Sequence, residues 1–79
     1  MTTFERIKMV VSEKCNFNVD LSEITEEAYL NRDLGLDSLD VVELAMEVER
    51  EFDLIVSDIE VESWLTVEDI LKTVETKLK

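Results

Sequence analysis

The chain contains no histidine and a single cysteine, Cys15, among its 79 residues. Without a histidine or a second cysteine, it offers no pair of a base and a nucleophile of the kind that drives covalent catalysis. One cysteine also excludes an internal disulfide. We interpret Cys15 as a small apolar residue near a helix end, because no second group is present to pair with it. The sequence therefore predicts a protein that is not an enzyme.

Proline is absent, glycine occurs once, and no apolar run approaches the roughly 20 residues that cross a bilayer. The start of the chain has neither the long apolar core of a signal peptide nor the basic bias of a transit peptide. We therefore expect a cytoplasmic protein without direct membrane insertion. The chain also lacks internal repeats, low-complexity tracts and linkers, so we expect residues 1–79 to form one domain.

Basic residues are scarce: 8 Lys and Arg stand against 20 Asp and Glu, which gives a net charge of −12 at pH 7. Such a charge repels nucleic acid and anionic membranes and favours partner proteins with basic surfaces. We expect a monomer that salt stabilises, because screening weakens the repulsion between its carboxylates. Hydrophobic residues make up 46% of the chain, which is enough for one core but leaves no room for a separate substrate domain.

The N-terminal stretch predicts a helix over about residues 3–14. Thr2 and Glu5 stand in capping-box spacing at its start. Apolar residues recur at helical spacing along one face. That face consists of Phe4, Ile7, Val10, Val11 and Cys15.

Residues 16–36 show no sustained period, yet they carry several apolar side chains that can anchor a loop on the core. These anchors are Phe17, Val19, Leu21, Ile24, Tyr29, Leu30 and Leu34. Asp20 and Glu23 are expected to cap a single turn within this stretch. An unanchored loop of this length would be unusual, so we predict an ordered crossover that packs on the core.

The next helix follows Asp37, and its residues divide into three stripes at 100° per residue. The buried face is predicted to consist of Val41, Leu44, Ala45, Val48 and Phe52. The acidic stripe beside it consists of Asp40, Glu43, Glu47 and Glu51. Leu39, Val42 and Met46 form an apolar stripe opposite the core, where an isolated small domain would ordinarily be polar. This apolar stripe, edged by carboxylates, is typical of a docking surface: the charges attract a partner protein, and the apolar side chains then contact it. The competing interpretation is that the stripe packs partly against the 16–36 loop.

Two helices are expected near the C-terminus. Ser57 and Glu60 predict a short helix over about residues 58–62, and Thr66 with Asp69 predicts the start of the last helix. The preceding Leu54-Ile55-Val56 is interpreted as a buried loop, with Ile59 and Trp64 adding core contacts. The face of the last helix consists of Val67, Ile70, Leu71, Val74 and Leu78. The predicted fold is all-α: a small bundle of three main helices plus a short third helix, with a long loop between the first two.

The segment Asp33-Leu34-Gly35-Leu36-Asp37-Ser38-Leu39-Asp40 places one hydroxyl, Ser38, behind the only glycine and at the start of an acidic helix. Gly35 can adopt a positive φ, and Asp37 is the expected helix cap. Ser38 then occupies the first helical position with its hydroxyl outward. Because carboxylates surround it, nothing nearby activates Ser38 as a nucleophile, so another protein must modify it. The helix dipole favours negative charge at this position.

Asp37-Ser38-Leu39, preceded by Leu34-Gly35 and followed by Val42, Glu43, Leu44, Glu47 and Phe52, resembles the motif of acyl carrier proteins. The resemblance spans nearly the whole chain, from the first helix through Thr66-Val67 to the last. It implies a carrier fold with a long first connection. It also implies that Ser38 carries 4'-phosphopantetheine, whose thiol holds acyl groups as thioesters.

The resemblance implies two kinds of partner for such a carrier. One is a phosphopantetheinyl transferase; the others are acyl-transfer and synthase enzymes of fatty-acid or type II polyketide synthesis with basic docking patches. The residues expected to be recognised by partners are Asp37, Leu39, Asp40, Val42, Glu43, Met46 and Glu47. Two departures from the family pattern bear on partners and cargo: Arg50 interrupts the acidic run, and Trp64 is bulkier than usual.

Two alternatives stay open. An aminoacyl carrier, as in peptide synthesis or D-alanyl transfer, is related, but Asp37 and the dense acids of the second helix favour acyl cargo. An acidic regulatory interaction module belongs to a different class. A calcium-binding EF-hand loop does not fit, because counting back from Gly35 places Leu30 at the first ligand position. No metal site is therefore expected.

Overall fold

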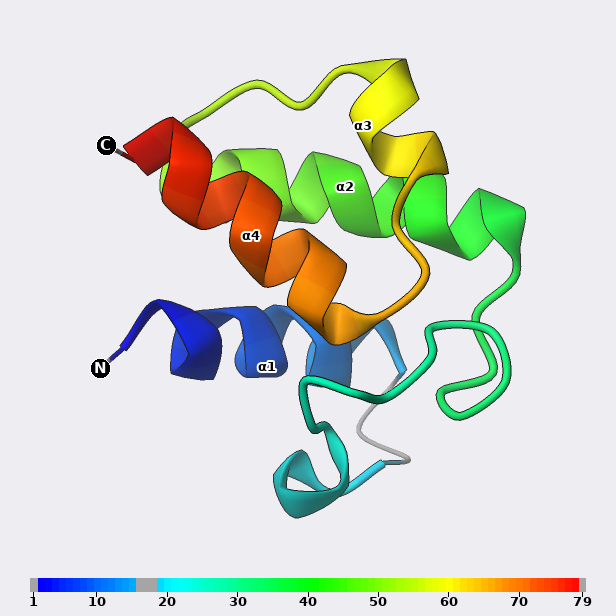
Figure 1. Ribbon diagram of the computed structural model, residues 1–79. Coiled ribbons are helices and arrows are strands. Elements are labelled where there is room, and N and C mark those ends of the chain that lie inside the picture. Colours follow the sequence, from blue (N-terminus) through cyan, green and yellow to red (C-terminus); the bar gives the residue numbers. More distant parts are fainter. Residues whose placement is uncertain (1, 16–18, 79) are drawn as a thin grey trace.

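The computed structural model describes residues 2–15 and 19–78, and within them every regular element is a helix. The elements are α1 (Thr3–Lys14), a 3-10 turn η1 (Leu21–Glu23), α2 (Ser38–Phe52), α3 (Asp58–Glu62) and α4 (Val67–Leu78), as Figure 1 shows. The all-α prediction is confirmed, as are the predicted bounds of α1 and α3 and the predicted starts of α2 and α4. None of the described helices combines the length and the apolar character needed to cross a membrane.

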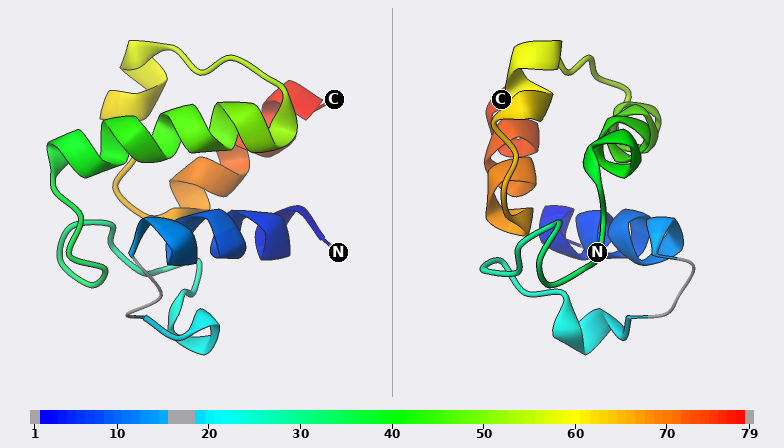
Figure 2. Two further views of the ribbon diagram at one scale, coloured as in Figure 1. Left: turned by 180° about the vertical axis from the view of Figure 1, so that it is seen from behind. Right: turned by 90° about the vertical axis from the view of Figure 1, so that its right-hand side faces the viewer.

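The helices pack around one core. α1 and α2 run in opposite directions, α4 crosses beside them, and short α3 lies beside the first half of α2 (Figures 1 and 2). The start of α1 and the end of α4 lie at the same end of the molecule. The buried apolar residues are Ile7, Val10, Val11, Cys15, Ile24, Ala28, Leu30, Leu34, Leu36, Leu44, Ala45, Val48, Phe52, Val56, Trp64, Val67, Ile70 and Val74. They come from α1, α2 and α4, from the residues that flank α3 and from the long connection.

Local side-chain caps begin the helices where the sequence predicted them. At α1, the Glu5 N–H donates to Thr2 Oγ1 at 3.1 Å and the Thr2 N–H donates to Glu5 Oε1 at 3.0 Å. Ser57 and Glu60 make the same reciprocal pair at α3, at 2.9 and 3.2 Å. At α4 the carboxylate of Asp69 accepts from the Thr66 N–H at 3.0 Å. These bonds satisfy N–H groups that a helix start leaves without partners.

Backbone hydrogen bonds tie the long connection to the start of α4, so the ordered crossover is confirmed for its described part. The Leu30 N–H donates to the Leu65 carbonyl at 2.9 Å, and the Val67 N–H donates to the Ala28 carbonyl at 3.1 Å. A single antiparallel bridge pairs Tyr29 with Thr66. The connection therefore forms part of the wall around the core.

Not every predicted anchor of this connection is buried. Ile24, Leu30 and Leu34 are buried, whereas Leu21 and Tyr29 are exposed, so their prediction as anchors was wrong. The Tyr29 ring instead lies beneath the guanidinium of Arg32, with 4.2 Å from Cζ to the ring centroid. The predicted turn exists at η1, but the side chain of Asp20 makes no capping hydrogen bond. Phe17 lies outside the described residues.

The prediction also failed for two isoleucines near α3. Ile55 and Ile59 are 80% and 79% exposed, although both were expected to contact the core. The helix is only five residues long, and its inward side is already occupied by Val61. Val56 and Trp64, which flank the helix, fill the remaining space over the core. Two exposed isoleucines therefore remain on the outer surface.

Candidate functional site

Gly35 turns the chain toward α2. Its φ of +72° lies in the left-handed region, where L side chains are strained. The Gly35 N–H donates to the Asn31 carbonyl at 3.1 Å, and the Leu36 N–H donates to the Leu30 carbonyl at 2.9 Å. A Cβ at this position would meet nothing within 4 Å. The backbone angle, and not a lack of space, therefore requires glycine, and the predicted positive φ is confirmed.

Asp37 caps α2, as predicted. Its Oδ1 accepts from the Asp40 N–H at 2.8 Å, and Asp40 Oδ2 accepts from the Asp37 N–H at 3.1 Å. The two aspartates thus form a capping box, with Asp40 in the place that glutamate or glutamine usually takes. This structural role of Asp40 was not predicted from the sequence. Both carboxylates have a local function besides any contact with partners.

Ser38 is the first residue of α2, and its side chain is exposed. At this position it lies at the positive end of the helix dipole, where backbone N–H groups face outward and favour an anion. The chain has no histidine to accept the hydroxyl proton. Within residues 2–15 and 19–78, no three or more acidic, cysteine or histidine side chains are grouped to hold a metal ion. The site therefore presents an accessible hydroxyl whose reaction needs an external base.

A groove opens beside Ser38, between the start of α2 and the end of α3. Its volume is about 810 Å³. Most of its lining residues are apolar; they are Leu30, Asn31, Gly35, Leu36, Asp37, Ser38, Val41, Val42, Val61, Glu62, Trp64 and Leu65. A flexible chain attached at Ser38 would have an apolar surface next to its point of attachment.

The apolar stripe of α2 stays on the surface. Leu39, Val42 and Met46 are 67%, 49% and 56% exposed. These values exclude close packing against the described part of the 16–36 connection, which was the competing interpretation. Val42 also lines the groove beside Ser38. The stripe and the groove thus meet at the first turns of α2.

The acidic stripe of α2 faces α1, and basic residues of α1 engage its two ends. Lys14, the last residue of α1, pairs with Glu43 and lies 3.7 Å from Asp40 Oδ1. At the other end, Arg6 Nε lies 3.1 Å from Glu51 Oε2, and its Nη2 donates to the Glu51 carbonyl at 2.8 Å. Two basic side chains of α1 therefore lie within ion-pair distance of three of the four acidic side chains.

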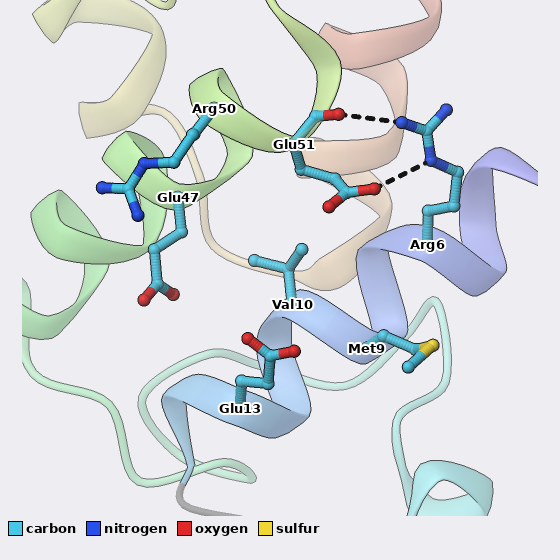
Figure 3. Close-up of a pocket in the computed structure, with 7 residues that line it drawn as sticks. All are labelled: Arg6, Met9, Val10, Glu13, Glu47, Arg50 and Glu51. Carbon is cyan, nitrogen blue, oxygen red and sulfur yellow. Dashed lines mark hydrogen bonds and ion pairs between the residues drawn. The ribbon is translucent and has the colours of Figure 1, made fainter.

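Glu47 and Arg50 complete this side of α2 (Figure 3). Glu47 lies between the two paired ends, and one of its carboxylate oxygens, Oε2, is buried without a hydrogen-bond partner among the described residues. Figure 3 shows Arg6 reaching Glu51 across the seam between α1 and α2, while the guanidinium of Arg50 points away from Arg6. Arg50 is exposed and has no ion pair within the described part of the chain. The unpaired charges on this side are thus Glu47 and Arg50.

The contacts at the end of α1 change the pKa values of two side chains, Lys14 and Cys15. The hydrogen bond to Glu43 raises the pKa of Lys14 above its ordinary value of 10.5, so its ammonium is charged at neutral pH. Burial raises the pKa of the Cys15 thiol, and its Sγ donates to the Leu34 carbonyl at 3.8 Å. A buried, protonated thiol reacts poorly. Cys15 is therefore the small core residue that the sequence predicted.

Sequence reasoning missed Lys14 because its partners are distant in the chain. Glu43 follows it by 29 residues, and no periodic pattern relates the two. The only available signal was that Lys14 ends the first helix beside an acidic second helix. That signal fixes neither the rotation of the helices nor the pairing of the side chains.

The sequence matches a known family and curated proteins over most of its length. A family model described as the phosphopantetheine attachment site matches residues 5–74. The acyl carrier protein of Thermotoga maritima is 48% identical over 75 residues, covering 95% of this chain and 90% of the relative. The acyl carrier protein of Wolinella succinogenes is 45% identical over 76 residues, covering 96% and 97%. That of Helicobacter pylori is 43% identical over 75 residues, covering 95% and 94%.

The fold gives the same result. A solved structure described as a candidate acyl carrier protein from Mycobacterium tuberculosis superposes with a TM-score of 0.86 at 29% identity. The match covers 95% of this chain and 97% of that one. The similarity in sequence and in structure therefore extends over the same, nearly complete length, and Ser38 lies inside the range that the family model matches.

Proposed function

The chain belongs to the acyl carrier protein family, and on that premise we propose that Ser38 is the residue to which its prosthetic group is attached. The family implies a covalently bound 4'-phosphopantetheine, as the resemblance predicted. Proteins of this kind carry groups for enzymes and do not catalyse reactions themselves. The observation that supports Ser38 most directly is its exposed hydroxyl at the first position of α2.

The residues present fit such a group. The phosphate would lie at the start of α2, where outward N–H groups and the helix dipole favour negative charge. Asp37 and Asp40 oppose it by charge, but the capping box already engages both carboxylates. Gly35 holds the turn so that Ser38 stays clear of the loop. When bound, the group supplies a terminal thiol that is joined to the acyl cargo as a thioester.

A transferase has to supply what this site lacks. Attachment joins the Ser38 oxygen to the phosphorus of the incoming group and releases the serine proton and the nucleotide part of coenzyme A. The chain has no histidine, and the capping box engages the nearby carboxylates of Asp37 and Asp40, so the partner has to accept that proton. A phosphopantetheinyl transferase is the expected partner for this step.

The groove beside Ser38 is the proposed shelter for the cargo. Its apolar lining removes hydrocarbon from water at roughly 25 cal/mol per Å² of apolar surface buried. Trp64 forms part of its wall and is held by α4, because its Nε1 donates to Thr73 Oγ1 at 3.0 Å. A fixed indole limits how far a chain can extend inward. We infer that Trp64 restricts the size of the acyl group.

The apolar stripe is the proposed docking surface for acyl-transfer and synthase enzymes. Three large apolar side chains on the first turns of α2 remain uncovered next to the groove. The net charge of −12 attracts partners with basic patches from a distance, and the apolar stripe then supplies close contact. The recognition roles of Asp37, Glu43 and Glu47 belong to the same proposal. A monomeric, cytoplasmic carrier formed by one domain over residues 1–79 stays a prediction.

Acyl cargo in fatty-acid synthesis or type II polyketide synthesis is the pathway we propose. The similarity to three acyl carrier proteins over nearly their whole length favours acyl groups over aminoacyl groups. To separate the two acyl pathways, the loaded carrier is supplied with malonyl groups and either the condensing and reductive enzymes of fatty-acid synthesis or, in a parallel reaction, a polyketide synthase. Saturated chains on the carrier would indicate fatty-acid synthesis, whereas acceptance only by a polyketide synthase would indicate the other.

Attachment at Ser38 is tested by intact-protein mass before and after incubation with coenzyme A and a broad-specificity phosphopantetheinyl transferase. The parent should gain the mass of one phosphopantetheine, and Ser38→Ala should gain none. Ser22→Ala is the matched control, because Ser22 is also exposed but lies in η1. It should be loaded like the parent.

Circular dichroism confirms that each variant is folded before loading. Loading of Ser38→Ala would place the attachment elsewhere and end the proposal. Absence of loading on the folded parent, with a competent carrier in the same tube, would reduce the Asp37-Ser38 pair to a helix cap.

A further inference from the structure

Lys14 forms ion pairs with Glu43 and Asp40, two carboxylates that partner proteins are expected to recognise. Its side chain is only 18% exposed, and its ammonium lies between Glu43 and Asp40, whose side chains are 53% and 35% exposed. The lysine comes from the end of α1, on the opposite side of the seam from α2. The acidic surface at the first turns of α2 is therefore a composite of three side chains from two helices.

Lys14 binds the carboxylate oxygens of Glu43 and Asp40, which a basic residue of a docking partner would also bind. We propose that Lys14 is an internal competitor for partner cations at Glu43 and Asp40, so that α1 determines which partners dock on α2. This inference rests on the proposed carrier function. A docking cation must first displace the ammonium of Lys14. The net effect of Lys14 is to weaken partners that depend on Glu43 and to leave other partners unaffected.

The strength of the internal pair fits such an exchange. The Glu43 side chain is 53% exposed, so water screens its pair with Lys14, and a partner can displace the lysine without separating α1 from α2. Glu43 is the more exchangeable of the two acids, because Asp40 also holds the capping box with Asp37. An arginine that binds a carboxylate through two parallel hydrogen bonds has the advantage over a single ammonium. The partner favoured at Glu43 is therefore one that presents an arginine.

Glu47 differs from Glu43 in that it forms no ion pair with Lys14, so the proposed competition depends on which carboxylate a partner binds. It lies one turn further along α2, and among the described residues its buried Oε2 has no hydrogen-bond partner. A partner cation directed at the accessible side of Glu47 would displace no ion pair of the described residues. Partners that differ in the position of their basic residues by one helical turn are thus treated differently by Lys14.

Lys14→Gln tests the competition, with Lys8→Gln as its matched control. Both variants remove one positive charge from α1, but Lys8 lies near the Phe4 ring and forms no ion pair with α2 within the described residues. The probe is a broad-specificity phosphopantetheinyl transferase, and the measured quantity is its KM for the apo-protein at several salt concentrations. Lys14→Gln should lower the KM at low salt about two- to fivefold more than Lys8→Gln does. The difference should disappear at high salt.

Two further variants separate competition from a change in folding. Lys14→Arg keeps the charge and can bind a carboxylate through two hydrogen bonds, so its KM should be equal to or higher than that of the parent. Glu43→Gln should raise the KM, and in the double variant with Lys14→Gln the gain from losing Lys14 should shrink, because only Asp40 of the two contested carboxylates remains. Circular dichroism and thermal unfolding confirm that each variant is folded.

The outcomes distinguish this inference from the proposed function. Equal KM values for Lys14→Gln and Lys8→Gln, or a higher KM for Lys14→Gln, would overturn the competition while Ser38 of the parent is still loaded. A parent that gains no phosphopantetheine mass in the same reaction would overturn the carrier function, and the inference with it.

Discussion

The indole nitrogen of Trp64 donates a hydrogen bond to Thr73 Oγ1 at 3.0 Å, and the Thr73 hydroxyl in turn donates to the Asp69 carbonyl at 3.0 Å. This chain of two bonds fixes the segment after α3 to the first turns of α4. Trp64 is only 4% exposed, so its N–H has little access to water. The wall of the groove beside Ser38 is therefore held by a polar contact inside an otherwise apolar layer.

Thr73→Val should lower the free energy of unfolding by about 1–3 kcal/mol, because it leaves the buried N–H of Trp64 without an acceptor. Urea unfolding followed by far-UV circular dichroism measures the loss. Thr76→Val makes the same chemical change at an exposed position of α4 and should cost far less. If both variants lost the same free energy of unfolding, the hydrogen bond from Trp64 to Thr73 would contribute nothing to stability.

Gly35→Ala should destabilise the protein through its backbone angle. At φ +72° an alanine would be strained by about 1–2 kcal/mol, although its Cβ would meet no neighbouring atom within 4 Å. Gly35→Asn should cost less, because asparagine tolerates the left-handed region better. The midpoints of urea unfolding of the three proteins should therefore fall in the order Gly, Asn, Ala. Destabilisation that is equal for both variants would indicate a steric cause instead.

Most of the fold could be predicted because its signals are local. The caps at Thr2 and Ser57 each involve residues three positions apart. Helical spacing of apolar residues identified the buried faces of α1, α2 and α4, except at Leu78, which lies at the end of α4 and is 50% exposed. Gly35 and Asp37 were predicted for the same reason, since a positive φ and an N-cap are properties of a few adjacent residues. The position of Ser38 at the start of α2 follows from them.

The errors arose where tertiary packing decides the outcome. Ile55 and Ile59 are apolar, yet the short α3 has only one inward side, so they remain outside. The ion pair of Lys14 with Glu43 depends on how α1 and α2 are rotated against each other, which no sequence pattern in a single chain specifies. The groove likewise appears only when α3 and α2 are placed side by side.

Asp53 ends α2 in a left-handed conformation, with φ 53° and ψ 54°. Glycine adopts this conformation without strain, so Asp53→Gly should raise the free energy of unfolding by about 1 kcal/mol. The substitution also removes a negative charge from a chain of net charge −12. Asp53→Asn removes that charge while keeping a side chain, and it separates the two effects. If Asn stabilises as much as Gly does, the gain comes from charge and not from the backbone.

Glu60 should make the stability of the protein depend on pH in the acidic range. The hydrogen bond from the Ser57 N–H, together with Lys77 at 3.1 Å, lowers the pKa of the Glu60 carboxyl below its ordinary value of 4.5. The folded state therefore binds this proton less tightly than the unfolded state. The stabilisation is complete above pH 4.5 and is lost as the pH falls through the lowered pKa.

A comparison of Glu60→Gln with Glu62→Gln measures how much the Glu60 carboxylate contributes to the free energy of unfolding. Both variants remove one negative charge from α3, so the general relief of repulsion between carboxylates is the same in each. Only Glu60→Gln removes a carboxylate that joins α3 to Lys77 of α4 and accepts the capping hydrogen bond. Glu60→Gln should be less stable than Glu62→Gln near neutral pH, and the two should converge as the pH falls through the lowered pKa of Glu60. A difference that stays constant over this range would show that the charge of Glu60 does not act through its cap.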